Sequence, residues 1–273
     1  MPLAQESHLS AWAEPFPGAN YLRQTFAVAE ADIRKLVHDP VELFTRMVQP
    51  VLWLLIFGQV FNRTRAIPTG GISYLDFMAP GILAQSVLFG AIFYGISLIW
   101  ERDLGIVQKY LVSPAPRSTL VLGRAISSTV RSLCQMVFVY GLSYVLHIQL
   151  RFQVFALAGV VLAVMLGSAI FSTFSLIVAC LVKSRERFMG IGQVLTMPLF
   201  FASNAIYPLS LMPGWLRVAS RGNPLSYEVD ALRTLMIVGS TTSFSLGTDF
   251  LMMFAAFVVM VVIATKLYPT IVT

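Results

Sequence analysis

Runs of apolar residues, each long enough to cross a lipid bilayer, recur along most of the chain. A helix of about 20 mostly apolar residues spans the roughly 30 Å of hydrocarbon in a bilayer. The pattern predicts about six such helices. Their approximate ends are Phe44–Phe61, Tyr74–Trp100, Ala125–Ile148, Phe152–Val182, Phe188–Leu211 and Phe250–Tyr268. The sequence therefore predicts an all-α integral membrane protein.

A different periodicity precedes the first of these runs. From Leu22 to Leu36 apolar side chains recur at three- and four-residue spacing, and charged side chains such as Arg23 and Glu30 take the opposite face. This is the pattern of an amphipathic helix, which we expect to end near Asp39–Pro40. Because a membrane span follows directly, we expect the helix to lie in the cytoplasmic interface. The alternative is a soluble helix packed on the rest of the protein.

Composition excludes a soluble globular protein. Hydrophobic residues make up 57% of the chain and charged residues 12%, whereas soluble domains carry about a quarter charged residues. No hydrophilic block separates the apolar runs. We therefore expect a transmembrane domain over residues 44–273, preceded by a cytoplasmic N-terminal segment, residues 1–43.

The net charge of +6 comes from short basic clusters between the apolar runs. Such clusters are not the single basic surface of a nucleic-acid-binding protein, so no nucleic-acid partner is expected. Most of them fall on one side of the membrane if the N-terminus lies inside, with Lys183, Arg185 and Arg187 in the clearest short loop. The arginines left for the outer side are Arg63, Arg65, Arg151, Arg217, Arg221 and Arg233. The positive-inside rule then predicts a multi-pass protein of the bacterial inner membrane with both termini in the cytoplasm.

The longest polar insertion on the predicted inner face runs from Glu101 to Arg124. Its first part, Glu101–Leu111, has the pattern of a short amphipathic helix, which is broken at Pro114. A helix below the membrane that ends in a Pro-x-Pro turn is well placed to meet a soluble partner, because the prolines fix the geometry of its end. An ordinary connecting loop is the alternative.

One arginine is placed within a predicted span. Arg131 lies about two turns into the third run and on the same face as Arg124. A charge there costs several kcal/mol unless the side chain snorkels to the interface or finds a partner. We expect either snorkelling or an ion pair with Glu101 or Asp103.

The fifth predicted span and the residues after it contain helix breakers at membrane depth. Pro198 lies inside the span, and an interrupted helix is tolerated only against protein or a water-filled cavity. The segment that follows is too polar to span, so we expect short re-entrant helices in the outer leaflet. Its marked positions are Asn223, Pro224, Glu228, Asp230 and Arg233. At i, i+3 spacing, Asp230 and Arg233 are expected to pair, and a substrate role is the alternative.

Several classes of functional motif are absent from the sequence. It has no G-x-x-x-x-G-K-[ST] phosphate-binding loop, no H-E-x-x-H motif and no C-x-x-C motif. The spans also lack the acidic residues expected of a proton- or sodium-coupled carrier. We therefore expect no catalytic residue, metal or cofactor in this chain, and we expect the energy for its work to come from another polypeptide.

Three stretches carry a family resemblance. They are RMVQPVLWLLIFGQVF at Arg46–Phe61, ERDLGIVQKYLVSPAPRSTLVLGR at Glu101–Arg124, and SNAIYPLSLMPGWL through NPLSYEVDALR, residues 203–233. In these stretches, and in their order, the chain resembles the ABC-2 type permeases. These are the membrane subunits of ABC exporters, among them the daunorubicin-resistance and nodulation-factor export proteins.

The resemblance implies a permease that uses ATP and Mg²⁺ bound to a separate nucleotide-binding subunit, present in two copies. It also implies a homodimer or a dimer with a similar permease. The residues implied in coupling to the ATPase are Glu101, Arg102, Asp103, Gly105, Lys109, Leu111, Pro114 and Arg117. Those implied for a pathway are Phe89, Phe93, Tyr94, Phe200, Phe201, Asn204 and Tyr207. The expected substrate is an amphiphilic drug, lipid, glycolipid or saccharide moved outward. The alternatives are a self-sufficient channel or secondary carrier, and a structural subunit without a pathway.

Overall fold

The chain folds into a bundle of long helices. The computed structural model describes residues 17–38, 40–64, 67–69, 71–107, 116–182, 184–240 and 242–268. Within these ranges the structure is helical, and the extended pairing in it is an isolated antiparallel bridge between Leu150 and Ile237. The predicted all-α class is therefore confirmed.

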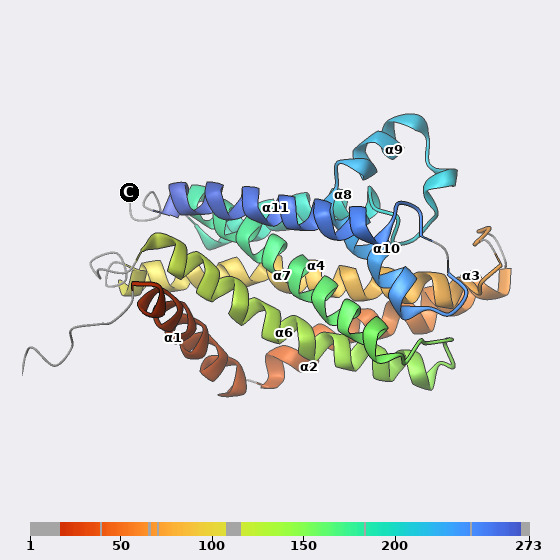
Figure 1. Ribbon diagram of the computed structural model, residues 1–273, viewed down its shortest axis with the longest axis horizontal. Coiled ribbons are helices and arrows are strands. Elements are labelled where there is room, and N and C mark those ends of the chain that lie inside the picture. Colours follow the sequence, from red (N-terminus) through yellow and green to blue (C-terminus); the bar gives the residue numbers. More distant parts are fainter. Residues whose placement is uncertain are drawn as a thin grey trace, which may run out of the picture.

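Long helices lie along the long axis of the molecule, and other helices lie at its two ends (Figure 1). In chain order the elements are α1 (Pro17–His38), α2 (Pro40–Leu52), the π-helical η2 (Trp53–Gly58), α3 (Gln59–Thr64), α4 (Tyr74–Asp103), α6 (Arg117–Val145), α7 (Val154–Leu181), α8 (Arg185–Phe201), the 3₁₀ turn η3 (Leu209–Leu211), α9 (Gly214–Arg221), α10 (Pro224–Met236) and α11 (Leu246–Leu267). Figure 1 shows α1 and the C-terminal end of α11 at one end of the bundle, and α3, α9 and α10 at the other. We call these the inner and outer ends.

Three of the helices, α4, α7 and α11, are long and apolar enough to cross a bilayer. They coincide with the second, fourth and sixth predicted spans. The first predicted span is formed by α2, η2 and α3 in succession, and the third by the more polar α6. The six-span arrangement remains a prediction.

Polar side chains set several helix starts. The hydroxyl of Ser73 accepts a hydrogen bond from the backbone N–H of Asp76 at 3.1 Å, and that of Ser245 accepts one from Thr248 at 3.2 Å. Each bond satisfies an N–H group that the first turn of a helix leaves without a partner. The starts of α4 and α11 are therefore encoded locally.

The fifth predicted span ends earlier than expected. Its helix, α8, stops at Phe201 and not at Leu211. The chain then turns against α4, where a Cβ atom on Gly81 would lie 2.4 Å from the carbonyl oxygen of Ala205. This close approach fixes an irregular segment at a depth where the apolar pattern continues, and Pro208 prevents a return to helix.

Small residues allow the central helices α4 and α7 to approach closely. The backbone N–H of Gly95 donates to the Ser175 hydroxyl at 3.1 Å, and that hydroxyl donates to the carbonyl of Ile92. A Cβ atom on Gly95 would lie 2.2 Å from the Ser175 oxygen. In a bilayer the hydrophobic effect does not drive helices together, because lipid tails are as apolar as the side chains. Close packing and interhelical hydrogen bonds of this kind stabilise helix–helix association instead.

The predicted amphipathic helix is present as α1, and it ends at His38 as expected. Its packed face includes Thr25 and Ala29, which are buried, whereas the apolar Leu22 and Phe26 are 58% and 59% exposed. The packed face lies on α6, where Gly123 leaves room for the α1 backbone. The interfacial location of α1 remains a prediction.

The outward faces of several helices are strongly apolar. On α11, Leu251, Phe254 and Val259 are each more than half exposed, and Phe155 at the start of α7 is 92% exposed. Exposed apolar surface of this extent is not found on soluble monomers. The chain is therefore membrane-embedded.

Candidate functional site

A buried ion pair joins α4 and α6 at the inner end of the bundle. Glu101 in the last turn of α4 accepts a hydrogen bond from the Arg124 guanidinium of α6. Their residues are only 6% and 3% exposed. Two charges withdrawn from water in this way depend on each other, because removing either partner leaves the other buried and uncompensated.

A second set of contacts ties the same end of α4 to the turn between α7 and α8. The Asp103 carboxylate accepts hydrogen bonds from Arg185 at 2.8 Å and from Arg102 at 3.3 Å. Arg185 also lies 3.4 Å from the centre of the Trp100 ring, and Arg102 donates to the carbonyl of Val182 at 3.2 Å. The end of α4 is thus linked to α6, α7 and α8 together.

The structure describes only some of the residues predicted to couple the permease to an ATPase. Glu101, Arg102 and Asp103 are the last residues of α4 and not the start of a separate helix. The chain then turns at Gly105, whose φ of 70° lies in the left-handed region that favours glycine. Lys109, Leu111 and Pro114 lie outside the described residues, and Arg117 is the first residue of α6. A separate coupling helix therefore remains a prediction.

A second arginine of α6, the partly buried Arg131, lies 4.8 Å from the centre of the Tyr94 ring. The Tyr94 hydroxyl in turn donates to the buried carboxylate of Asp32 on α1. A cation over an aromatic face is stabilised by the quadrupole of the ring. The two acids expected as candidate partners of Arg131 are engaged by other arginines, since Glu101 binds Arg124 and Asp103 binds Arg185.

A polar layer crosses the middle of the bundle. The hydroxyls of Ser128 and Ser132 on α6 each lie 2.9 Å from the hydroxyl of Ser168 on α7. On the same helix, Gly167 contacts Glu228 of α10, because a Cβ atom there would lie 2.3 Å from the Glu228 carboxyl carbon. The small residues along α7 could have signalled this contact surface, since small-xxx-small spacing marks close helix packing in membranes.

Glu228 is fully buried, and neither carboxylate oxygen has a hydrogen-bond partner in the part of the chain that the structure describes. Burial raises the pKa of Glu228 well above its ordinary range, because the charged form loses its hydration. Burial on α10 therefore favours the protonated form of this side chain over the charged form.

Asp230, one turn further along α10, holds the loop that leads to α11. Its carboxylate accepts hydrogen bonds from the Thr242 hydroxyl at 3.0 Å and from the backbone N–H groups of Ser243 at 2.8 Å and Phe244 at 3.0 Å. At the other end of the helix, Asn223 accepts from the N–H of Leu225 at 3.0 Å and so caps α10. Pro224 occupies the first helical position, where a missing N–H costs little.

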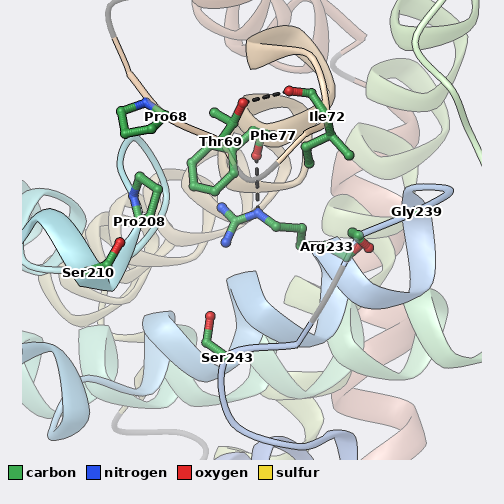
Figure 2. A pocket seen from close by; sticks show the side chains of 10 residues that line it. Pro68, Thr69, Ile72, Phe77, Pro208, Ser210, Arg233, Gly239 and Ser243 are labelled. Atoms are coloured by element: carbon green, nitrogen blue, oxygen red, sulfur yellow. Dashed lines mark hydrogen bonds between the residues drawn. The ribbon is translucent and has the colours of Figure 1, made fainter.

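Arg233 faces away from that loop and toward α4. It donates to the carbonyl of Asn204 at 2.7 Å. It also donates to the carbonyl of Phe77 at 3.3 Å, and it lies 3.7 Å from the centre of the Phe77 ring (Figure 2). Burial lowers the pKa of Arg233 to about 10, and the Asp230 carboxylate opposes this shift. The predicted Asp230–Arg233 ion pair is not among the ion pairs of the described residues, because backbone groups of neighbouring elements bind both side chains.

The residues expected to line a pathway do not converge. Phe89 and Phe93, with ring centres 6.4 Å apart, line a cleft together with Arg46 and Gln135. By contrast, Phe200 packs in the core. Tyr94 and Asn204 are buried, Phe201 is 44% exposed, and the Tyr207 hydroxyl donates to the carbonyl of Phe201. The polar side chains of the cleft, which the sequence did not single out, come from α2, α4 and α6.

Comparison with known proteins places the chain among transport permeases. A family model for the ABC-2 type transporter matches residues 23–237. A putative transport permease, ycf38, from Cyanophora paradoxa is 30% identical over 218 residues, which cover 79% of this chain and 74% of that protein. The daunorubicin resistance ABC transporter permease protein DrrB1 from Streptomyces coeruleorubidus is 25% identical over 199 residues, covering 73% and 70%. The inner membrane transport permease YadH from Escherichia coli K12 is 26% identical over 210 residues, covering 73% and 78%. The matched range includes the charged contacts at both ends of the bundle.

Proposed function

The chain belongs to the ABC-2 type transporter family, and from this premise we propose that it is the membrane half of an exporter that moves an amphiphilic substrate outward. As a transport permease subunit it is not itself the ATPase, and members of the family pair with an ABC ATPase subunit. In our proposal ATP and Mg²⁺ bind to two copies of that subunit, and the permease changes its affinity for substrate between two states.

The observation that carries the proposal is the linkage at the inner end of the bundle. Glu101 binds Arg124 of α6, and Asp103 binds Arg185 of α8, so one short stretch of α4 is linked to two other helices. A partner that docks at the turn after Gly105 could move these helices together. The predicted coupling helix, Glu101–Leu111, begins in this stretch of α4 and continues past that turn in the sequence.

We further propose six spans, with both termini in the cytoplasm, a cytoplasmic segment over residues 1–43 and α9 and α10 in the outer leaflet. Two observations support this topology. The basic residues Arg102, Arg185 and Lys266 gather at the inner end with the end of α11, as the positive-inside rule requires. The helices α9 and α10 are too short to cross a bilayer.

A second permease copy would complete the transport path in this proposal. The cleft lined by Phe89 and Phe93 opens on the surface of a single chain, between α2, α4 and α6. Two such clefts facing each other across a twofold axis would enclose a path lined by aromatic and polar groups. The name of the DrrB1 relative, a daunorubicin resistance permease, supports an amphiphilic substrate.

The first experiment is co-purification with candidate ABC ATPases, followed by transport in proteoliposomes. We expect one ATPase to co-purify and to drive ATP-dependent transport. Glu101→Gln should keep the assembly but lower transport by about tenfold, which corresponds to about 1.4 kcal/mol in the barrier. The matched control is Glu30→Gln, which removes a carboxylate from an exposed ion pair with Arg34 on α1 and should leave transport unchanged.

Two outcomes would contradict the proposal. Flux through the purified permease without ATP would favour a self-sufficient channel or carrier. Transport that survives deletion of this chain would make it a structural subunit without a pathway.

A further inference from the structure

We propose that the outer end of this permease holds a binding site for the phosphate or carboxylate group of an amphiphile, built around Arg233. The inference rests on the proposed function and names the chemical class of the substrate. Its basis is a pair of adjoining cavities between α4, α9, α10 and the loops that connect them.

The first cavity is lined by hydroxyl groups around a guanidinium. Figure 2 shows Arg233 reaching into the space between Phe77, Pro208 and Ser243. Thr69 and Ser240 also line this cavity. The hydroxyls of Thr69 and Ser240 donate to the carbonyls of Ile72 and Arg233. The Ser210 and Ser243 hydroxyls and the guanidinium are therefore the donors that face the cavity, and such donors suit an acceptor-rich group such as phosphate.

Arg233 retains unused hydrogen-bonding capacity toward this cavity. Its Nε atom donates to the carbonyl of Phe77 and its Nη2 atom to the carbonyl of Asn204, so these two carbonyls fix the orientation of the guanidinium group. The Nη1 atom makes no hydrogen bond within the described residues, and it is not among their buried unsatisfied atoms. A guanidinium has five N–H donors, so the side chain is oriented by the protein and open to a ligand.

The charge of Arg233 has no ion-pair partner in the described part of the chain. No acidic residue lines either cavity. The nearest acid along α10 is Asp230, whose carboxylate is occupied by the Thr242 hydroxyl and by the N–H groups of Ser243 and Phe244. Asp230 therefore acts on Arg233 through its charge but forms no ion pair with it, and an anionic ligand in the cavity would offset more of the cost of burying the guanidinium.

The second cavity extends the positive charge and adds an apolar surface. It shares Pro208, Ser210 and Ser243 with the first, and Arg217 and Arg221 of α9 line it. Tyr227 and Phe244, with ring centres 4.9 Å apart, line the same cavity. Guanidinium groups beside an aromatic surface match a ligand that has both an anionic group and an apolar part.

The sequence contains an independent sign of this site. The positive-inside rule disfavours arginine on the outer side of a membrane protein, yet Arg217, Arg221 and Arg233 all lie at the outer end. The structure brings these three side chains to adjoining cavities instead of scattering them over the surface. A common anionic ligand accounts for their position.

Binding to the purified full-length permease, without any ATPase, tests the inference. The probes are dioctanoyl phosphatidic acid, dioctanoyl phosphatidylcholine and inorganic phosphate. Ser210 is exposed and lines both cavities, so Ser210→Asp adds a negative charge there without disturbing the buried Arg233. We expect phosphatidic acid to bind more tightly than either other probe, and Ser210→Asp to weaken it by about tenfold, the effect of losing one charge-assisted contact.

Three further variants, one in the second cavity and two controls outside both cavities, complete the test. Arg217→Gln removes a cavity charge and should also weaken phosphatidic acid binding. Arg63→Gln removes an exposed outer arginine that lines neither cavity, and Thr64→Asp adds a charge beside it, so both should bind like the wild type.

Specific outcomes would overturn the inference. Equal affinity for phosphatidic acid and phosphatidylcholine would show that the cavities do not select a net negative charge, and unchanged binding by Ser210→Asp would exclude an anion site there. Equal affinity for phosphatidic acid and inorganic phosphate would exclude an amphiphile as the ligand. Because no ATPase is present, these outcomes are distinguishable from a failure of the exporter proposal, which the co-purification experiment reports.

Discussion

Ionisable side chains inside the bundle are stabilised in different ways. Glu101 has an arginine, Asp230 has backbone N–H groups and a hydroxyl, and Arg131 has an aromatic ring. Glu228 has neither a charged partner nor a hydrogen bond within the described residues. Neutralisation by a proton is the remaining way to bury such a group, and it makes stability depend on pH.

Glu228→Gln should stabilise the protein increasingly as the pH rises. A carboxyl group whose pKa is higher in the folded than in the unfolded chain adds stability at low pH and loses it as the pH rises. Between the unfolded value near about 4.3 and the folded value, the loss is about 1.4 kcal/mol per pH unit. Glutamine does not titrate, so the variant should avoid this loss.

Thermal unfolding midpoints measured from about pH 5 to about pH 8 would check this prediction. The difference between variant and wild type should grow across the range. Glu30→Gln, at an exposed ion pair on α1, should show no comparable growth. A pH-independent difference for Glu228→Gln would mean that the effect comes from packing alone.

At the scale of the helix, contacts depend on positions that have no side chain. Gly123 on α6 admits α1 so closely that a Cβ atom there would lie 2.7 Å from Val28 and 2.8 Å from the carbonyl of Thr25. Gly141, on the same helix, has nothing within 4 Å of its Cβ position. The two glycines of α6 therefore provide a matched pair for testing how α1 is held.

Gly123→Leu should displace α1 from the bundle, while Gly141→Leu should not. Overpacking a close contact costs about 1–3 kcal/mol, and a helix held on one side can relieve that strain by moving away. Hydrogen exchange of the amides of residues 21–34 should become about tenfold faster in Gly123→Leu, as expected for a loss of about 1.4 kcal/mol. Equal exchange in the two variants would show that α1 is not held at this contact.

Much of the helical arrangement could be predicted from the sequence, but the partners of individual residues could not. The long apolar runs gave α4, α7 and α11 within a few residues, because a bilayer sets the length of a span. Periodicity places Asp230 and Arg233 on one helix face. It does not predict that the loop before α11 binds Asp230 and that the backbone of α4 binds Arg233. For the same reason, the periodicity of α1 predicted a helix but not the residues through which it packs on α6.

The end of α8 is another such case. Apolar composition continues through Leu211, whereas the helix stops at Phe201 because the following segment packs against Gly81 of α4. That contact joins residues far apart in the chain. The spacing of residues within one segment of the sequence therefore could not predict this contact.

At the scale of the whole molecule, charge and apolar surface are arranged along one axis. Ion pairs gather at the inner end, arginine-lined cavities lie at the outer end, and exposed apolar side chains such as Leu251 and Phe254 cover the flank of α11. This is the arrangement expected of a protein that meets water at two ends and lipid between them. It makes the orientation of the two ends testable.

Single cysteines should report which end faces the cytoplasm. With Cys134 and Cys180 replaced by alanine, Arg187→Cys lies at the exposed inner start of α8, and Thr64→Cys lies at the exposed outer end of α3. In intact cells a membrane-impermeant maleimide should label the Thr64 variant, and it should reach the Arg187 variant only after permeabilisation. The reverse pattern would invert the proposed topology.

The tight glycine contacts also limit how this family can diverge. Side chains at Gly81, Gly95, Gly123 and Gly167 would each overlap an atom of a neighbouring helix or of the segment after α8. A descendant sequence could exchange most of its apolar residues for others and keep the bundle, since cores tolerate such exchanges when volume is preserved. At Gly167 the facing atoms belong to the Glu228 side chain, so drift there requires a smaller facing residue, whereas at Gly81 they are backbone atoms of Ala205, so the backbone itself would have to move. The four glycines would therefore serve as fixed points for aligning distant sequences that share little else.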